Sequence, residues 1–184
     1  MVHLFCSAKK MSFNYFANPR AFAYLADKGK GCHFCKTNED CLDGANLFGL
    51  EDIVAVCFDC MAAGKLIELD ISANVINESA LDSELNTVAV SNEITYCTPS
   101  LPTWQDSHWP VKNGKPYRFI KIASKLDYDS KVQFVDTLFD CDQDPELWDM
   151  LPDHKIENIK DGQYDISFYL FEDSGEKLTI WDAN

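Results

Sequence analysis

Two Cys-x-x-Cys pairs lie close together in this chain, and they constrain its fold more than any other feature. The first pair is Cys32 and Cys35, in GCHFCK, and the second is Cys57 and Cys60, in VCFDCMAAGK, with 21 residues between them. Two thiolates three positions apart bind one metal ion from a tight turn. Two such turns supply the tetrahedral four-sulfur set that Zn²⁺ prefers. We therefore predict one structural zinc ion held by these four cysteines.

The alternatives for these thiols are free buried cysteines, disulfides or a redox pair. A redox protein needs only one such pair, at a helix start in a βαβ context, and no such context is evident. Four protein sulfurs leave no coordination position for water or substrate, so the predicted zinc is structural rather than catalytic. His33 and Cys41 are nearby spare ligands, which we interpret as structural or incidental.

The residues around the second pair predict how the metal lobe folds. The strand-like run EDIVAV precedes it and MAAGKLIEL, rich in helix formers, follows, so we expect Cys60 in the first turn of a helix. A turn, a hairpin and a pair that enters a helix form a treble-clef arrangement. The predicted class is α+β: a treble-clef-like four-cysteine zinc lobe packed with a C-terminal antiparallel β-hairpin or sheet and a few short helices.

The chain of 184 residues, 46% of them hydrophobic, is long enough to bury a core. We expect a loose extension over residues 1–12, a zinc-binding lobe over 13–71 and an acidic α+β lobe over 72–184 that shares its core. The start at Met1 or Met11 stays open. No signal peptide is visible and no run approaches the roughly 18 apolar residues of a spanning helix. We expect a cytoplasmic protein with reduced or metal-bound thiols.

The net charge of −14 is unevenly distributed along the chain. Residues 1–66 carry seven Lys/Arg and seven Asp/Glu, whereas residues 126–184 carry four Lys/Arg and sixteen Asp/Glu. Nucleic-acid binders normally show a basic stripe, so nucleic-acid binding through the neutral zinc lobe is disfavoured. An acidic surface serves solubility or attracts a basic protein partner.

Local patterns predict the remaining elements. Residues 13–28 form an extended segment with buried aromatic anchors, and ESALDSELNTVAV (78–90) contains one helix. We expect PYRFIKIAS (116–124) to be a strand. Residues 130–139 are compatible with helix or strand, and their apolar positions 135, 138 and 139 favour helix. The final YDISFYLFEDSGEKLTIWD is a hairpin with a glycine at positive φ in its turn. The residues on which these predictions rest are Phe13, Tyr15 and Phe22 as anchors, Ser79 or Asp82 as helix cap, and Gly175 as turn glycine.

The segment from Thr95 to Pro110 is rich in tryptophan and proline. A short helix from Thr103 to Trp109 is compatible with its three prolines. Trp104 and Trp109 are best interpreted as packing residues, with a binding platform as the alternative. His108, between them, is the candidate acid or base of a small hydrolase-like pocket, although no nucleophile with a base and an orienting group is evident.

The run DCDQDPELWDML has the carboxylates of a calcium loop at Asp140, Asp142 and Asp144. Pro145 stands where such a loop requires glycine, and Leu151 where it requires a bidentate glutamate. We instead expect Asp144 to cap a helix that begins at Pro145.

Several segments, in order, resemble the bacterial CbrC family, which is associated with colicin tolerance. They are FNYFANP, the first cysteine pair, CFDCMAAGK, and FYLFEDSGEKLTIWD near the end. The most specific element is a Thr-Pro…Trp-Gln…Trp signature at Thr98, Pro99, Trp104, Gln105 and Trp109. Family members often carry further cysteines after this signature and in the terminal hairpin. This chain lacks them there, and Cys97 and Cys141 do not rebuild a second set.

The resemblance implies a role in bacterial toxin tolerance or immunity, and the charge distribution suggests how. Nuclease toxins carry basic clefts that an acidic lobe can occupy. We expect a cytoplasmic zinc-stabilised protein that binds a basic partner such as a nuclease toxin domain. The small hydrolase described above is the alternative, and the oligomeric state is not predicted. The candidate contacts are Asp140, Asp142, Asp144, Glu146, Asp149, Trp104 and Trp109.

Overall fold

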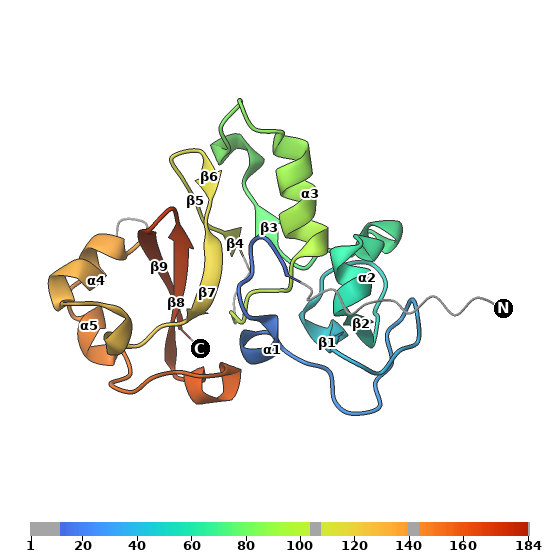
Figure 1. The fold of residues 1–184 in the computed structure, drawn as a ribbon, viewed down its shortest axis with the longest axis horizontal. Coiled ribbons are helices and arrows are strands. Elements are labelled where there is room, and N and C mark those ends of the chain that lie inside the picture. The colour runs from blue at the N-terminus through green and yellow to red at the C-terminus, as the bar shows by residue number, and fades with distance from the viewer. Residues whose placement is uncertain (1–11, 104–107, 140–143, 184) are drawn as a thin grey trace.

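The computed structural model describes residues 12–103, 108–139 and 144–183, which form a mixed arrangement of short helices and strands (Figure 1). The helices are α1 (Pro19–Phe22), α2 (Phe58–Ala62), α3 (Thr87–Cys97), α4 (Lys131–Thr137) and α5 (Leu147–Met150). The strands are β1 (Cys41–Asp43), β2 (Ala55–Cys57), β3 (Val75–Ile76), β4 (His108–Trp109), β5 (Val111–Lys112), β6 (Lys115–Pro116), β7 (Arg118–Ile122), β8 (Ile166–Asp173) and β9 (Glu176–Ala183).

A three-stranded antiparallel sheet in the order β7-β8-β9 is the largest element of the fold. β8 and β9 pair without a break from Ile166–Ala183 to Asp173–Glu176. Their two-residue turn places Ser174 at φ 49° and Gly175 at φ 86°, as hairpin turns that match the strand twist require. The predicted strand before Ser124 and the predicted C-terminal hairpin are both confirmed.

The aromatic segment at the start of the described chain covers one edge of this sheet. Phe16 forms a parallel bridge with Phe119 of β7, and their rings lie 4.7 Å apart. Phe13 and Phe22 are buried as predicted, while Tyr15 is partly buried. The segment therefore pairs with the edge of β7 through a single bridge, and α1 interrupts the extended run that was predicted for residues 13–28.

Two hydrophobic clusters occupy the two faces of the sheet. α4 and α5 cover one face, with Phe134 packed against Phe168 of β8. The other cluster extends from Phe13 to Leu178 and includes the buried residues of the cysteine-rich part of the chain. In Figure 1, the cysteine-rich part lies on the opposite side of β7 and β8 from α4 and α5.

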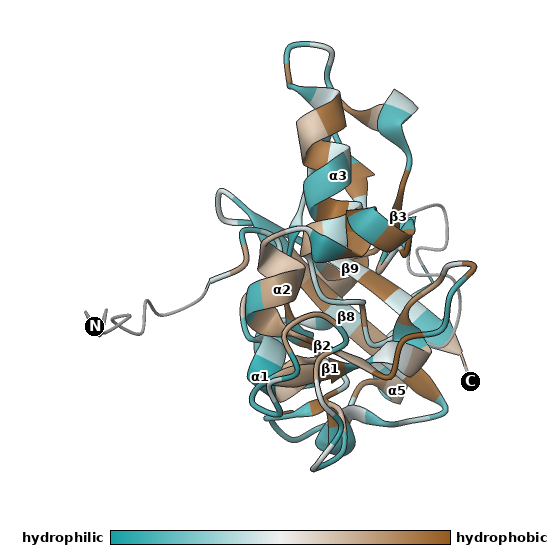
Figure 2. Ribbon diagram, turned by 90° about the vertical axis from the view of Figure 1, so that its right-hand side faces the viewer, coloured by the Kyte–Doolittle hydropathy of each residue, from teal (hydrophilic) through white to brown (hydrophobic). Residues whose placement is uncertain are grey.

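α3 begins later than the sequence pattern predicted. Residues Glu78–Ala80 form a 3-10 turn, and the helix starts at Thr87 with the side chain of Asn86 as its cap. Asp82, a predicted cap, instead donates its N–H to the carbonyl of Gly114 at 2.9 Å. This long-range bond holds the chain in a turn where local propensity favoured helix. Figure 2 shows polar and apolar bands alternating along α3.

Three smaller predictions have different outcomes. α4 is confirmed, and the Ser130 hydroxyl caps it by accepting the N–H of Gln133. The helix proposed after Asp144 begins at Leu147, two residues later than expected, and the Asp144 carboxylate accepts the N–H of Glu146 in the preceding turn. The helix predicted from Thr103 to Trp109 is wrong at its described end. His108 and Trp109 form β4, which pairs with β3.

No helix in the described part of the chain is long and apolar enough to cross a membrane.

Candidate metal centre

The first cysteine pair sits in a tight knuckle that backbone hydrogen bonds hold closed. The N–H of Cys32 donates to the carbonyl of Thr37 at 2.7 Å, and the N–H of Lys36 donates to the carbonyl of Cys32 at 3.0 Å. Lys36 adopts the left-handed conformation, φ 64°, which the turn after Cys35 requires. The knuckle therefore brings both thiols to one side of the turn.

The second pair is delivered by a strand that runs directly into a helix. β1 and β2 pair antiparallel, with Cys41 opposite Cys57. Cys57 ends β2 and is the N-cap of α2, where its sulfur accepts the N–H of Cys60 at 3.4 Å. The prediction that Cys60 lies in the first turn of a helix is confirmed. The N–H of His33 donates to the carbonyl of Ala55 at 2.8 Å and so joins the knuckle to β2.

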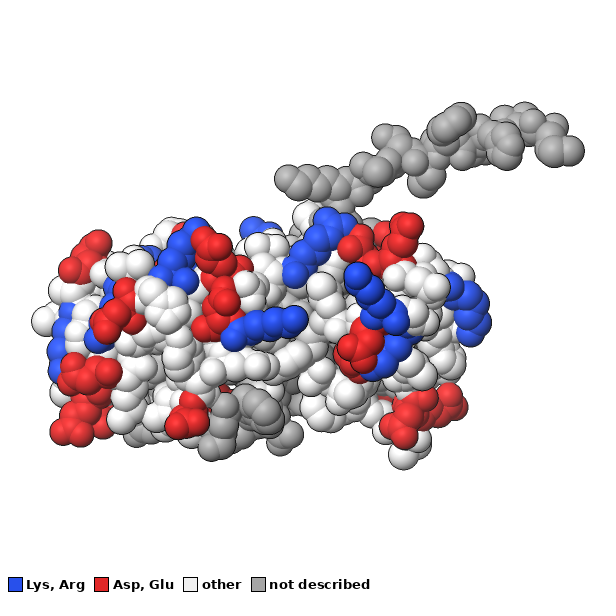
Figure 3. Space-filling view, turned by 90° about the horizontal axis from the view of Figure 1, so that it is seen from below, with Lys and Arg blue, Asp and Glu red and all other residues white. Residues whose placement is uncertain are grey.

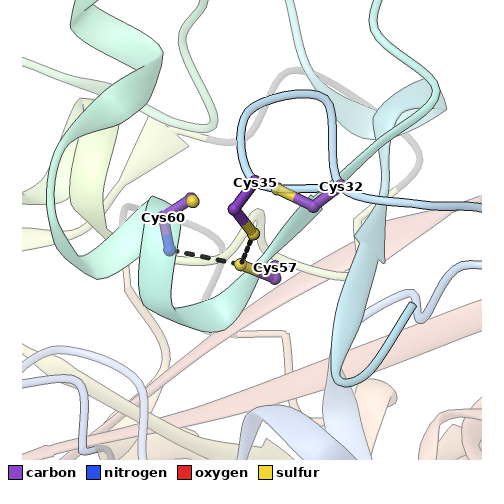
Figure 4. A group of neighbouring side chains, drawn as sticks. All are labelled: Cys32, Cys35, Cys57 and Cys60. Carbon is purple, nitrogen blue, oxygen red and sulfur yellow. Dashed lines mark hydrogen bonds between the residues drawn. The ribbon is translucent and has the colours of Figure 1, made fainter. Parts of the chain in front are cut away.

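The four predicted cysteines meet in one cluster (Figure 4). The sulfurs of Cys32, Cys35, Cys57 and Cys60 all lie within 4.8 Å of one another, and those of Cys35 and Cys57 are 3.5 Å apart. A tetrahedral Zn²⁺ with Zn–S bonds of about 2.3 Å separates its sulfurs by about 3.8 Å. A disulfide needs about 2.05 Å, and all four cysteines are free. The donor set and its spacing fit a metal ion such as zinc.

Cys32 and Cys57 are buried, Cys60 is partly buried and Cys35 is exposed, so most of these thiols lie where burial opposes their ionisation. Burial raises the pKa of Cys57 and also that of Cys60, the latter to about 11. Burial opposes ionisation of Cys32 too, but backbone N–H groups, including those of Cys35 and Phe34, outweigh it and lower the Cys32 pKa to about 6. Adjacent sulfurs cannot all carry charge unless a cation compensates them, and a bound metal deprotonates coordinating thiols.

The two spare ligands lie outside the cluster, as expected. Cys41 is buried, and its thiol donates to the carbonyls of Thr37 and Glu39 at 3.4 and 3.5 Å. The His33 ring packs edge-on against Phe34, with the ring centroids 5.2 Å apart. The cluster that the structure assembles contains four cysteines and neither of these side chains.

The four-cysteine cluster is joined to the core through α2. Met61 is fully buried, and the ring of Phe58 meets that of Phe13 edge-on at 5.8 Å. The Arg20 guanidinium lies over the Phe58 ring at 5.9 Å and forms an ion pair with Asp40. The helix that carries Cys60 is therefore packed directly against core residues.

The described part of the tryptophan segment places Trp109 in the core and His108 at the surface. Trp109 is 3% exposed, and its indole N–H donates to the carbonyl of Tyr117 at 2.7 Å. Its ring meets those of Tyr15 and Phe171 edge-on, so it packs in the core and offers almost no surface to a partner. His108 is exposed, and neither cavity identified among the described residues is lined by it. Trp104 lies outside the described residues.

The structure describes only three of the five acidic residues that were predicted to contact a partner. Asp140 and Asp142 lie outside the described residues, while Asp144, Glu146 and Asp149 are exposed. Asp144 is engaged in its turn, and Asp149 lies 3.6 Å from the Lys131 ammonium. Figure 3 shows acidic and basic side chains interspersed over one face of the molecule.

Sequence reasoning missed a groove at the end of the sheet, where Arg118 and Glu172 lie on paired strands. These residues are 54 positions apart and carry no shared motif, so only the strand register brings them together.

Comparison with known proteins identifies a family. No curated protein and no solved structure matches the chain. A family model described as "Uncharacterised protein family (UPF0167)" matches residues 11–173, which include all four cysteines of the cluster and most of the fold. The chain belongs to the uncharacterised protein family UPF0167.

Proposed function

We propose that this protein binds one Zn²⁺ through Cys32, Cys35, Cys57 and Cys60, and that the metal is structural. The observation that carries the proposal is the mutual approach of the four sulfurs to within 4.8 Å, from a knuckle and from a helix N-terminus. Four protein thiolates complete a tetrahedral set, so no position remains for water or substrate. The zinc links the knuckle to α2 and stabilises the adjoining core.

The same geometry supports a finer description of the fold. The order of knuckle, short hairpin and helix N-terminus is that of a treble clef. On this proposal, residues 13–71 form the zinc lobe and residues 72–184 form the acidic lobe that shares its core. Residues 1–12 then stand apart as a loose extension.

Metal analysis tests the zinc assignment. We expect the full chain, purified under reducing conditions, to contain one equivalent of zinc. Replacement by Co²⁺ should give the intense near-ultraviolet charge-transfer bands of a thiolate site. Cys60→Ser should lose the stoichiometric metal. Cys97→Ser is the matched control, because Cys97 is a free, partly buried thiol outside the cluster, and it should retain one equivalent. Full zinc content in Cys60→Ser would refute the ligand set.

We infer that the folded protein acts by binding another protein, in bacterial toxin tolerance. The resemblance to the CbrC family supports this theme, and the acidic C-terminal part supports a basic partner such as a nuclease toxin domain. A thiolate zinc site also favours a reducing compartment such as the cytoplasm.

Copurification from cells that produce the tagged protein tests this role. Recovery of a basic protein that dissociates as salt rises is expected, because exposed charges are screened with a Debye length of about 8 Å at physiological ionic strength. Glu146→Lys with Asp149→Lys should weaken its recovery. A partner whose recovery depends on neither salt nor these carboxylates would contradict the electrostatic mechanism.

A further inference from the structure

An open groove of about 450 Å³ lies beside the β8–β9 turn, at one end of the sheet. In Figure 1, the β5–β6 hairpin lies at the same end of the sheet. Its volume is within the range of small-molecule sites. Its walls come from β6, β7, β8 and the aromatic segment beside β7. The lining residues are Asn14, Tyr15, Pro116, Arg118, Ile120, Glu172, Asp173 and Ser174.

The charged groups of this groove do not neutralise one another. Arg118 and Glu172 are directly opposite on β7 and β8, the arrangement in which opposite charges usually pair. A guanidinium nitrogen of Arg118 instead donates to the carbonyl of Phe13 at 3.3 Å. Among the ion pairs formed by the described residues, none includes Arg118, Glu172 or Asp173. The Arg118 guanidinium and the carboxylates of Glu172 and Asp173 therefore line the same groove, and each can form an ion pair with a ligand.

The apolar side of the groove is held by regular structure. The carbonyl of Tyr15 accepts the N–H of Phe119 at 2.8 Å, and the Tyr15 ring packs against the buried ring of Trp109. Ile120 lies on β7 and packs against the cluster beneath α4 and α5. Burial, and then the negative charges of Glu93 and Asp173, raise the pKa of Tyr15, so its hydroxyl stays protonated and able to donate. These contacts preform an apolar wall beside the charged groups.

We propose that this groove binds a free α-amino acid with a large apolar side chain. The carboxylate of such a ligand pairs with Arg118, and its ammonium group with Glu172 and Asp173. The ammonium and carboxylate groups of the ligand are both bonded to its α-carbon, and this short separation matches the opposite charges of Arg118 and Glu172 on neighbouring strands. The side chain then lies against Tyr15, Pro116 and Ile120.

The charge arrangement disfavours simpler ligands. A small anion meets Arg118 but is repelled by two carboxylates, and a small cation meets the carboxylates but is repelled by Arg118. A zwitterion satisfies both signs, and charge-assisted hydrogen bonds to both of its ends set its orientation. This inference is independent of the zinc centre, which lies in another part of the fold.

Titration of the zinc-loaded protein by heteronuclear NMR tests the proposal. L-leucine and L-phenylalanine are the probes, with N-acetyl-L-leucine lacking the ammonium group and L-leucinamide lacking the carboxylate. We expect saturable shifts of the backbone amides of Arg118, Glu172 and Asp173 with at least one free amino acid. The two blocked analogues should bind at least about tenfold more weakly, because each loses a hydrogen-bonded charge.

Matched variants separate the two ends of the site. Arg118→Gln and Glu172→Gln should each weaken binding by about tenfold or more, while Arg118→Lys should retain part of it. Glu157→Gln, an exposed acid paired with Lys155, should leave it unchanged. The dispersed spectrum of each variant reports its folding. Saturable binding of leucinamide as tight as that of leucine would make this a cation site. Absence of saturable shifts with both free amino acids, or shifts confined to other residues, would overturn the proposal.

Discussion

The sulfur of Cys57 lies 3.5 Å from that of Cys35, although the two residues are 22 positions apart in sequence. Cys57 also ends β2 and caps α2, so one residue belongs to a strand, a helix terminus and the candidate metal centre. This position explains why the chain around the four cysteines needs so little regular structure. Two three-residue strands and a five-residue helix supply few hydrogen bonds, and the proposed zinc ion would supply the missing cross-link.

Cys57→Ser should abolish stoichiometric zinc binding and greatly destabilise the protein, because structural zinc sites contribute on the order of 10 kcal/mol to folding. Cys41→Ser is the matched control, since Cys41 is buried and lies opposite Cys57 on β1 but outside the cluster. It should retain one zinc. Metal analysis and thermal melting of both variants measure the difference. Zinc loss in Cys41→Ser with retention in Cys57→Ser would reverse the assignment.

Lys36→Gly should stabilise the knuckle. Lys36 is held at φ 64°, a conformation that costs an L-residue about 1–2 kcal/mol and costs glycine almost nothing. The Lys36 ammonium also donates to the carbonyl of His33, so Lys36→Ala controls for loss of that bond without relieving the backbone. In urea unfolding of the zinc-loaded proteins, the free energy of unfolding should be higher for Lys36→Gly than for Lys36→Ala. The opposite order would refute the backbone explanation.

The residues that were predicted correctly share a local cause. The spacing within each cysteine pair, the strand-like runs on either side of Gly175, and the apolar positions of α4 are each encoded within a few neighbouring positions. Such patterns specify a turn, a hairpin or a helix start without reference to the rest of the chain.

The features that were missed depend on contacts between distant segments. The bond from Asp82 to Gly114 delays α3, and the parallel pairing of β3 with β4 makes a strand where a helix was expected at His108. The groove likewise exists only once β7 and β8 are in register. Local propensity does not contain these long-range pairings, and tertiary context overrides it.

Trp109→Ala should cost about 3–5 kcal/mol as a core truncation, because Trp109 is 3% exposed and bonds to the Tyr117 carbonyl. Trp109→Phe should cost less but still leave that buried carbonyl without its donor. Trp181→Ala, at a 36% exposed position on β9, is the control and should cost much less. Chemical denaturation compares the three variants. A cost for Trp109→Ala no larger than that for Trp181→Ala would contradict the packing role.

Asn74 is a buried hydrogen-bonding centre that sequence patterns did not reveal. Its side-chain amide donates to the carbonyls of Ile94, Thr98 and Pro99 at 3.0–3.2 Å, and its oxygen accepts the N–H of Leu101. The residue thus holds the chain where it leaves α3.

Asn74→Leu should lower the free energy of unfolding by about 3 kcal/mol or more, since several buried backbone groups lose their partner. Asn74→Asp keeps the shape and the acceptor but removes the donor, and it should destabilise more strongly at pH 7 than at pH 4. Its carboxylate then faces carbonyl oxygens, and protonation restores one donor. Equal destabilisation at both pH values would show that donation by this side chain is unimportant.

The ion pair between Arg20 and Asp40 predicts a specific pH dependence. The side-chain hydrogen bond from Arg20, and then its charge, lower the pKa of Asp40 below its ordinary value. Because the folded-state pKa is lower than the unfolded one, the associated stabilisation is present above the unfolded pKa of about 3.9 and is lost as pH falls through the folded pKa. Both side chains are largely exposed, so salt should weaken the effect.

Arg20→Gln should therefore raise the pKa of Asp40 towards its ordinary value in a carboxyl NMR titration. Asp43 provides the internal comparison, because its carboxylate accepts hydrogen bonds from the Lys30 ammonium and from the N–H of Ala45. Burial raises the Asp43 pKa, but these bonds outweigh it and lower the net value. Arg20→Gln should leave Asp43 unchanged, and Lys30→Gln should raise the pKa of Asp43 only in part, since the backbone donor remains. An Asp40 pKa that is the same with and without Arg20 would show that the pair does not join α1 to the start of β1 in solution.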